Sequence, residues 1–144
     1  MNKSSVIPLC FLLSLYASPA FAGSNHKRPL QQAPPAEATR TNPYDGQQQA
    51  AKAGQKLYRR ECSGCHGSEA QGARRGPALV SPTLSEARPG TIFWVLRNGS
   101  LGAGMPSFSH LPEAQRWQIV TYLETLQSGR FLPPDAGIGA AHGK

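Results

Sequence analysis

Apolar side chains recur at helical spacing in three stretches of the chain. Residues 48–60 mix small and apolar positions with Lys and Arg, which predicts a short amphipathic helix. Residues 91–97 are apolar on nearly every side, which predicts a mostly buried helix between a Pro-Gly pair and an Asn-Gly pair. The strongest period runs from Glu113 to Leu126. No stretch alternates as a strand does, so the pattern predicts an all-α fold.

The first 22 residues carry the pattern of an export signal. Lys3 gives a positive start, residues 6–17 are apolar, and Ala20-Phe21-Ala22 is a small-x-small cleavage site. The apolar run is shorter than the roughly 20 residues that a membrane span needs. We therefore expect residues 1–22 to be a signal peptide that is cleaved after about Ala22, and the mature protein to be periplasmic.

Composition divides the remainder of the chain into a domain and two flanks. Residues 23–46 are rich in Pro, Gln and Ala and offer little to bury, which predicts a disordered leader. A spacer is the simpler interpretation of this leader, and a partner-binding segment is the alternative. Residues 131–144 are predicted to form a flexible tail. One small domain, residues 47–130, remains between them.

A short motif, Cys62-Ser63-Gly64-Cys65-His66, follows the first predicted helix. Two thiols three positions apart with a histidine directly after them are the attachment pattern of a c-type haem, one thiol for each vinyl group and the histidine for iron. A bare Cys-x-x-Cys also occurs in dithiol redox sites and in half of a zinc site. The zinc alternative lacks a second ligand pair, because the only other cysteine is Cys10. The dithiol alternative lacks the surrounding βαβ pattern.

Met105 is the candidate for the opposite axial position. It lies in a Gly-rich loop between the second and third predicted helices and is followed by Pro106. A loop methionine has little core to fill, so its thioether is free to reach the iron opposite His66. His110 is the rival sixth ligand. A domain this small buries little surface by itself, so we expect the haem-free chain to be largely unfolded.

In the order and spacing of these features the chain resembles the class I cytochrome c family, over most of residues 47–127. That resemblance implies a cytochrome c fold in which the first and last helices cross, with Gly54 allowing close approach of Tyr122. It also implies that the Pro77 carbonyl accepts a hydrogen bond from His66 Nδ1, which orients the ligand. The short segment between Pro77 and Met105 is more similar to small bacterial monohaem domains, some of which are subunits of larger enzymes.

The ligand pair predicts the chemistry. With His66 and Met105 on opposite faces, iron has no open position for oxygen or substrate, so the site exchanges one electron and the chain is an electron carrier and not an enzyme by itself. Two roles stay open, a free periplasmic carrier and a dedicated subunit of a periplasmic dehydrogenase or oxidase complex. A gas sensor or peroxidase would need an open iron site.

Charge bears on the partner. The chain of 144 residues has a formal net charge of +7. Arg59-Arg60 and Arg74-Arg75 lie on either side of the haem motif in the sequence, which predicts a redox partner with an acidic docking surface. The alternative is a scattered basic surface that only keeps the domain soluble. An exported haem protein is a poor candidate for nucleic-acid binding, whereas contact with an anionic membrane surface stays open.

Overall fold

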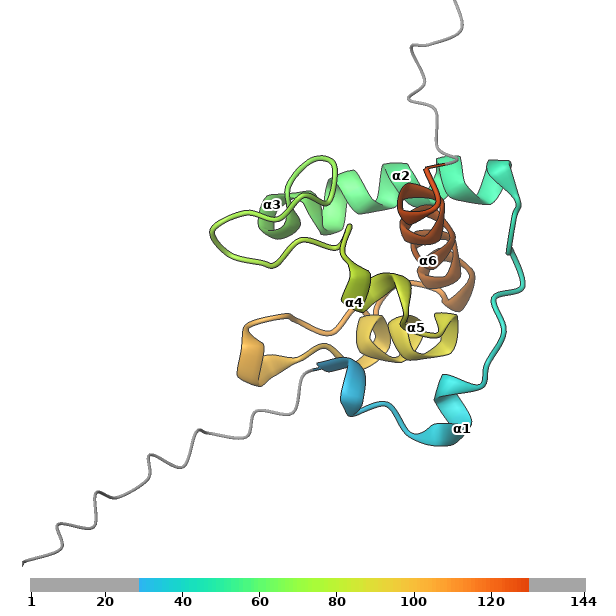
Figure 1. Cartoon of the computed structure of the whole chain (residues 1–144), viewed down its shortest axis with the longest axis horizontal. Helices are drawn as coiled ribbons and strands as arrows, with labels where there is room; N and C mark the ends of the chain where they lie inside the picture. The colour runs from blue at the N-terminus through green and yellow to red at the C-terminus, as the bar shows by residue number, and fades with distance from the viewer. Residues whose placement is uncertain (1–28, 130–144) are drawn as a thin grey trace, which may run out of the picture.

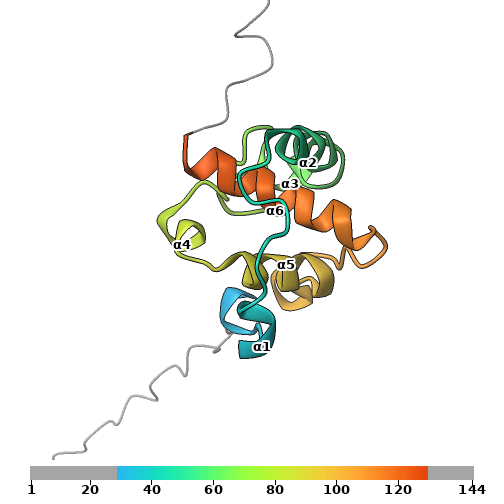
Figure 2. The same cartoon turned by 90° about the vertical axis from the view of Figure 1, so that its right-hand side faces the viewer.

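The computed structural model describes residues 29–129, which form helices joined by loops (Figures 1 and 2). Within this range extended backbone pairs only at two isolated bridges, which confirms the all-α prediction. No helix in this range is long and apolar enough to cross a membrane. The predicted signal peptide and tail lie outside the described residues. In chain order the elements are η1 (Pro29–Gln31), α1 (Pro35–Ala38), α2 (Gln48–Glu61), α3 (Ser63–His66), α4 (Pro82–Ser85), α5 (Pro89–Asn98), η2 (Leu101–Ala103) and α6 (Glu113–Gln127).

The crossing of α2 and α6 is the main packing contact of the domain (Figure 1). Gly54 lies at the crossing, where a Cβ atom would stand 1.9 Å from the backbone oxygen of Gln118 and 3.0 Å from Tyr122 Cβ. The Tyr58 and Tyr122 rings then meet with centroids 5.3 Å apart. The crossing that the resemblance implied is therefore present, with Gly54 as the residue that allows it.

Helix α5 packs against the first half of α6 through aromatic rings. Phe93 is fully buried, and its ring stacks on Trp117 with centroids 4.1 Å apart and an interplanar angle of 16°. The prediction of a mostly buried helix in this stretch is confirmed, and the helix begins two residues earlier than the pattern indicated. Its buried residues are Gly90, Thr91, Ile92, Phe93, Val95 and Leu96.

The prediction of a disordered leader over residues 23–46 is wrong for residues 29–46. This segment, here called the N-terminal strap, carries η1 and α1, and both pack against α5. Further along the strap, the buried side chain of Asn42 donates from Nδ2 to Thr121 Oγ1 (3.0 Å) and to Glu124 Oε2 (2.8 Å) on α6. Residues 23–28 lie outside the described residues.

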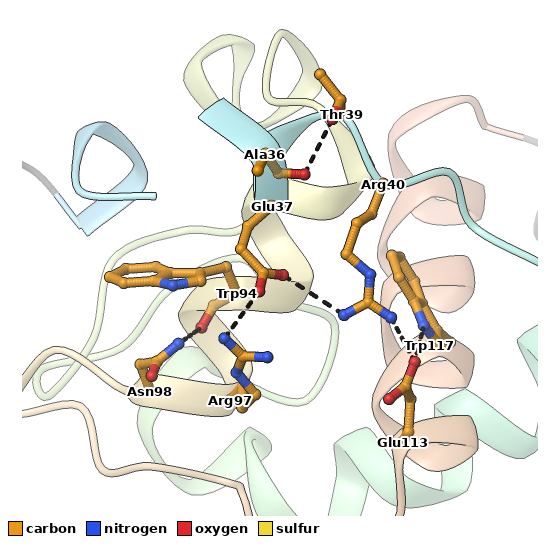
Figure 3. Close-up of polar contacts among 9 residues, drawn as sticks. All are labelled: Ala36, Glu37, Thr39, Arg40, Trp94, Arg97, Asn98, Glu113 and Trp117. Carbon is orange, nitrogen blue, oxygen red and sulfur yellow. Dashed lines mark hydrogen bonds and ion pairs between the residues drawn. The ribbon is translucent and has the colours of Figure 1, made fainter. Parts of the chain in front are cut away.

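Arg40 connects the strap to α5 and α6 (Figure 3). Its guanidinium carbon lies 4.5 Å from the Phe93 ring centroid and 5.3 Å from that of Trp117. The same group forms ion pairs with Glu37 of the strap and with Glu113 of α6. The strap is thus held by a cation over aromatic rings and by polar contacts, which need few apolar residues in the strap itself. The disorder predicted from a composition rich in Pro and Gln is therefore not found in residues 29–46.

Candidate haem site

The two motif cysteines lie on a single helical turn at the end of α2. Cys62 caps α2 with a hydrogen bond from its N–H to the backbone carbonyl oxygen of Tyr58 (2.8 Å), and α3 begins at the next residue. The N–H groups of Cys65 and His66 both donate to the Cys62 oxygen, at 3.1 and 3.0 Å. Residues three apart on such a turn share a face, so both thiols are directed to one side.

Both thiols are free, but their surroundings differ. Cys62 is buried and Cys65 is partly exposed. Burial, with a smaller contribution from the Glu61 carboxylate, raises the pKa of the Cys62 thiol to about 12. In the haem-free chain this sulfur is therefore a neutral thiol at neutral pH.

The His66 ring is fixed by one hydrogen bond. Its Nδ1 lies 2.8 Å from the Pro77 carbonyl oxygen, which can only accept, so Nδ1 carries the proton. The contact that the resemblance implied is therefore present in the structure. In the neutral ring Nε2 is then the unprotonated nitrogen, with its lone pair available to a metal.

A glycine lets the Pro77 turn come close to the imidazole. At Gly76 a Cβ atom would stand 2.9 Å from both the Cys65 oxygen and His66 Nδ1. Gly76 also pairs with Ala73 in an isolated bridge, which closes the turn. A larger residue would push the turn away from the ring, so the Pro77 contact depends on this glycine.

Tyr58 connects the haem motif to the helix crossing. Its hydroxyl donates to the Gly67 carbonyl (2.8 Å), directly after His66. The side chain is fully buried, and this burial raises the pKa of its hydroxyl well above the usual value. The position of the chain after His66 is therefore tied to the packing of α2 on α6.

Met105 closes a short loop after α5. Its N–H and C=O both pair with Ser100, at 3.0 and 2.8 Å, so the loop begins and ends at this bridge. Gly99 enters the loop with a φ of 71°, and a Cβ there would stand 2.6 Å from the backbone of Pro106. The Met105 side chain is partly buried and packs against the apolar core.

The described residues offer the donors that a haem c needs. Two free thiols and an imidazole with a free Nε2 stand on one turn, and a thioether comes from a separate loop. The loops that carry Pro77 and Met105 extend to the same side of the α2–α6 pair in Figure 1. Among residues 29–129 no cluster of three or more His, Cys, Asp or Glu could hold a metal by itself, so the zinc alternative has no ligand set there. The donors fit the haem prediction.

The other predicted residues are His110 and the two arginine pairs, and of these Arg59 is bonded to the motif, where its backbone oxygen accepts a hydrogen bond from Ser63 Oγ (2.6 Å). His110 is exposed, with its ring centroid 6.0 Å from that of Phe108. Arg59 and Arg60 are exposed at the end of α2, where Arg60 pairs with Glu61. The remaining arginine pair is exposed in the turn before Pro77.

A cavity of about 400 Å³ lies elsewhere, under the N-terminal strap. None of the predicted haem residues lines it. It is therefore not the haem site. Its lining residues are Ala38, Thr39, Arg40, Thr41, Asn42, Asp45, Arg88, Pro89 and Glu124.

One residue beside the site was missed by sequence reasoning. Arg116 is buried in α6 and contacts the carbonyls that follow the Met105 loop. A signal was available, since Arg116 stands three, four and seven positions before Ile119, Val120 and Leu123, all of which are buried. An arginine on the apolar face of a helix is a residue with a specific partner.

Comparison with known proteins points to the same class of domain. The family model described as "Cytochrome C oxidase, cbb3-type, subunit III" matches residues 49–123. The crystal structure of cytochrome CL from the marine methylotrophic bacterium Methylophaga aminisulfidivorans is similar, with 29% sequence identity and a TM-score of 0.53. The match covers 59% of this chain and 58% of that one, so it spans little more than half of either. No curated protein matches the chain.

The family match covers just over half of the chain and includes the haem motif, the Pro77 turn, the Met105 loop and most of α6. Members of this family are c-type cytochrome domains that bind haem c covalently and transfer electrons. The chain belongs to this family: it is a small c-type cytochrome whose cofactor is haem c with its iron.

Proposed function

We propose that this chain is a periplasmic one-electron carrier in which His66 and Met105 are the axial ligands and Cys62 and Cys65 are the attachment residues. The observation that carries the ligand assignment is the 2.8 Å hydrogen bond between His66 Nδ1 and the Pro77 oxygen. It fixes the tautomer, orients the ring and makes Nε2 a stronger donor. Bound haem c supplies an iron that changes its charge by one electron.

The residues around the iron favour its reduced form. A thioether such as that of Met105 is a soft, neutral donor, and His/Met ligation raises the reduction potential compared with stronger donors. The apolar core behind Met105 acts in the same direction, because burial disfavours the more charged state. With His66 and Met105 both holding the iron, no position would remain open to oxygen or substrate. The chain therefore acts as a fairly oxidising electron acceptor.

Two measurements test the site. Mass spectrometry of the denatured exported protein should show one haem per chain, and a mass equal to the bare polypeptide would exclude attachment at Cys62 and Cys65. The ferric protein should show the weak far-red band of a methionine–iron bond, and Met105→Ala should abolish it. His110→Ala is the matched control and should leave the band unchanged. A band that survives Met105→Ala would contradict the assignment.

The periplasmic location rests on the export pattern of residues 1–22. Attachment of c-type haem outside the inner membrane agrees with it. Cell fractionation with N-terminal sequencing tests this: a mature protein that begins near Gly23 in the periplasmic fraction is expected. A haem-free full-length chain in the cytoplasm would contradict the proposal.

The surface near the haem motif supports an acidic redox partner. Arg59, Arg74 and Arg75 are exposed and form no ion pair within the described residues. Leu101, in the Met105 loop, is 82% exposed and offers an apolar contact. Exposed arginines together with an exposed leucine fit a partner that carries carboxylates around its own redox centre.

Steering by charge predicts a salt-dependent rate. Association with an acidic partner should slow as salt rises past about 0.1 M, where the screening length is about 10 Å. Reversal of Arg74 and Arg75 to Glu should slow electron transfer and leave the haem spectrum unchanged. Reversal of Lys52 and Arg88, which are also exposed, is the charge-matched control. Rates that are flat in salt and equal for both variants would favour a role in solubility only.

A dedicated subunit of a larger redox complex is the second candidate. The description of the matching family, subunit III of a cbb3-type oxidase, favours it. The sequence left a subunit of a periplasmic dehydrogenase or of an oxidase complex open, and the dehydrogenase is equally compatible with one small haem domain. Native purification separates the roles, since a carrier elutes alone and a subunit elutes with its larger partner.

A further inference from the structure

Arg116 is a buried cation that forms no ion pair in the described part of the chain. The residue is 7% exposed, and none of the ion pairs within residues 29–129 includes it. Its Nε is buried and has no hydrogen-bond partner among the described residues. Keeping an unpaired charge out of water is unfavourable, so the contacts that this guanidinium does make must offset that cost.

Those contacts lead to the segment that follows Met105. Arg116 Nη1 donates to the Ser109 oxygen (3.2 Å) and to the Leu111 oxygen. Its guanidinium carbon also lies 5.1 Å from the Phe93 ring centroid, on α5. The arginine therefore lies between α6, α5 and residues 105–111, here called the ligand segment.

The ligand segment contains no helix or strand, so single contacts decide where it lies. On one side it is held by the end of α5: Ser107 Oγ donates to the Arg97 oxygen (2.6 Å), and the Phe108 N–H donates to the Leu96 oxygen (2.9 Å). The two bonds from Arg116 hold it from the side of α6. Hydrogen bonds from a charged donor are stronger than those between neutral groups.

We propose that Arg116 is a positioning residue for the axial methionine: it holds the ligand segment against α6 and so keeps the Met105 thioether on the iron. The inference rests on the proposed His66/Met105 ligation. In a chain without this guanidinium, the segment keeps its attachment to α5 but is free to move on its other side. Met105 then leaves the iron more often, and an added ligand competes more easily.

Imidazole is the probe, because it binds ferric haem only when the methionine has left. Its dissociation constant is measured by optical titration of the purified haem-loaded protein, alongside the denaturation midpoint. Arg116→Leu should tighten imidazole binding about tenfold, since it removes hydrogen bonds from a charged donor. Arg40→Leu is the matched control. This change removes the other guanidinium over Phe93 and loosens the N-terminal strap. The contacts that Arg40 makes are with the strap, α5 and α6 and not with the ligand segment.

The outcomes separate this inference from the proposed function. A wild-type protein without the far-red band would overturn both. With the band present, imidazole affinity of Arg116→Leu within about twofold of wild type would overturn the inference alone. Equal tightening in Arg40→Leu would also overturn it, because the effect would then follow stability. Should Arg116→Leu fail to accumulate with haem, Arg116→Lys decides. An ammonium lacks the planar fork of arginine, so tighter imidazole binding is again expected, and unchanged binding refutes the proposal.

Discussion

The contact between α2 and α6 at Gly54 sets a measurable limit on what the domain tolerates. In Gly54→Ala the added Cβ would stand 1.9 Å from the Gln118 oxygen and 2.5 Å from its carbonyl carbon. Ordinary contact begins at 3.4 Å, so the helices must separate by about 1.5 Å. The obstacle is backbone inside a helix and not a flexible side chain, so it cannot rotate away.

This separation places the energetic effect near the upper end of the overpacking range, about 3 kcal/mol. A domain of this kind has a total stability of about 5–15 kcal/mol. With a guanidinium m-value of about 4 kcal/mol per molar, the denaturation midpoint should fall by about 0.7 M. The loss should be accompanied by weaker packing of Tyr58 on Tyr122, since the helices that carry the rings move apart.

The assay is guanidinium denaturation of the haem-loaded protein, followed by helix signal and haem absorbance. Gly64→Ala is the matched control, because nothing lies within 4 Å of its added Cβ and the position is also helical. Alanine is favoured over glycine in helices by about 1 kcal/mol, so this control should be neutral or stabilising. Equal midpoints for Gly54→Ala and wild type would show that the helices do not meet at this residue.

Three further changes have defined outcomes. Tyr58→Phe removes one of the two hydrogen bonds to the Gly67 carbonyl and leaves the one from the Ala70 N–H, so it should lower stability by about 0.5–1.5 kcal/mol in denaturant titrations. Arg40→Leu should release the N-terminal strap, seen as faster hydrogen exchange of residues 35–42, and an unchanged exchange rate would contradict the role of Arg40. Burial raises the pKa of Glu124, so the folded protein binds a proton on this carboxyl group more tightly than the unfolded chain does. The stability that this protonation contributes is complete below the unfolded pKa and is lost as pH rises through the folded pKa. Glu124→Gln should therefore raise the midpoint at about pH 7 and change it little at about pH 4.

The three long helices could be predicted because their signals are local. A Pro-Gly pair, an Asn-Gly pair and a regular apolar period bound α5 and α6 within two residues, and the haem motif identifies the end of α2. The contact between His66 and Pro77 came from the family resemblance, since residues eleven positions apart carry no periodic signal of their own.

The N-terminal strap was missed because its partners are distant in the sequence, and Arg116 was missed because its partners are backbone carbonyls in a segment with no periodic signal. Arg40 binds rings on α5 and α6, more than fifty positions away, and its segment has too few apolar residues to predict burial. In the sequence Arg116 looks like an ordinary exposed charge on a helix, and its role becomes visible only when the structure shows its contact with Ser109. Composition measures what a segment can bury by itself, and it does not measure what a neighbour offers.

The strap also determines where the domain can be cut. A fragment that begins at residue 47, the domain boundary that the sequence pattern indicates, would lose the Arg40 guanidinium that lies over Phe93 and Trp117. It would also lose the backbone of α1 that packs on Gly90, where there is no room even for a Cβ. The two stacked rings would then be exposed to water and form an apolar surface on which a second molecule could pack. Such a fragment is expected to self-associate as its concentration rises, whereas one that begins at Pro29 stays monomeric. Sedimentation of the two fragments at several concentrations would show the difference.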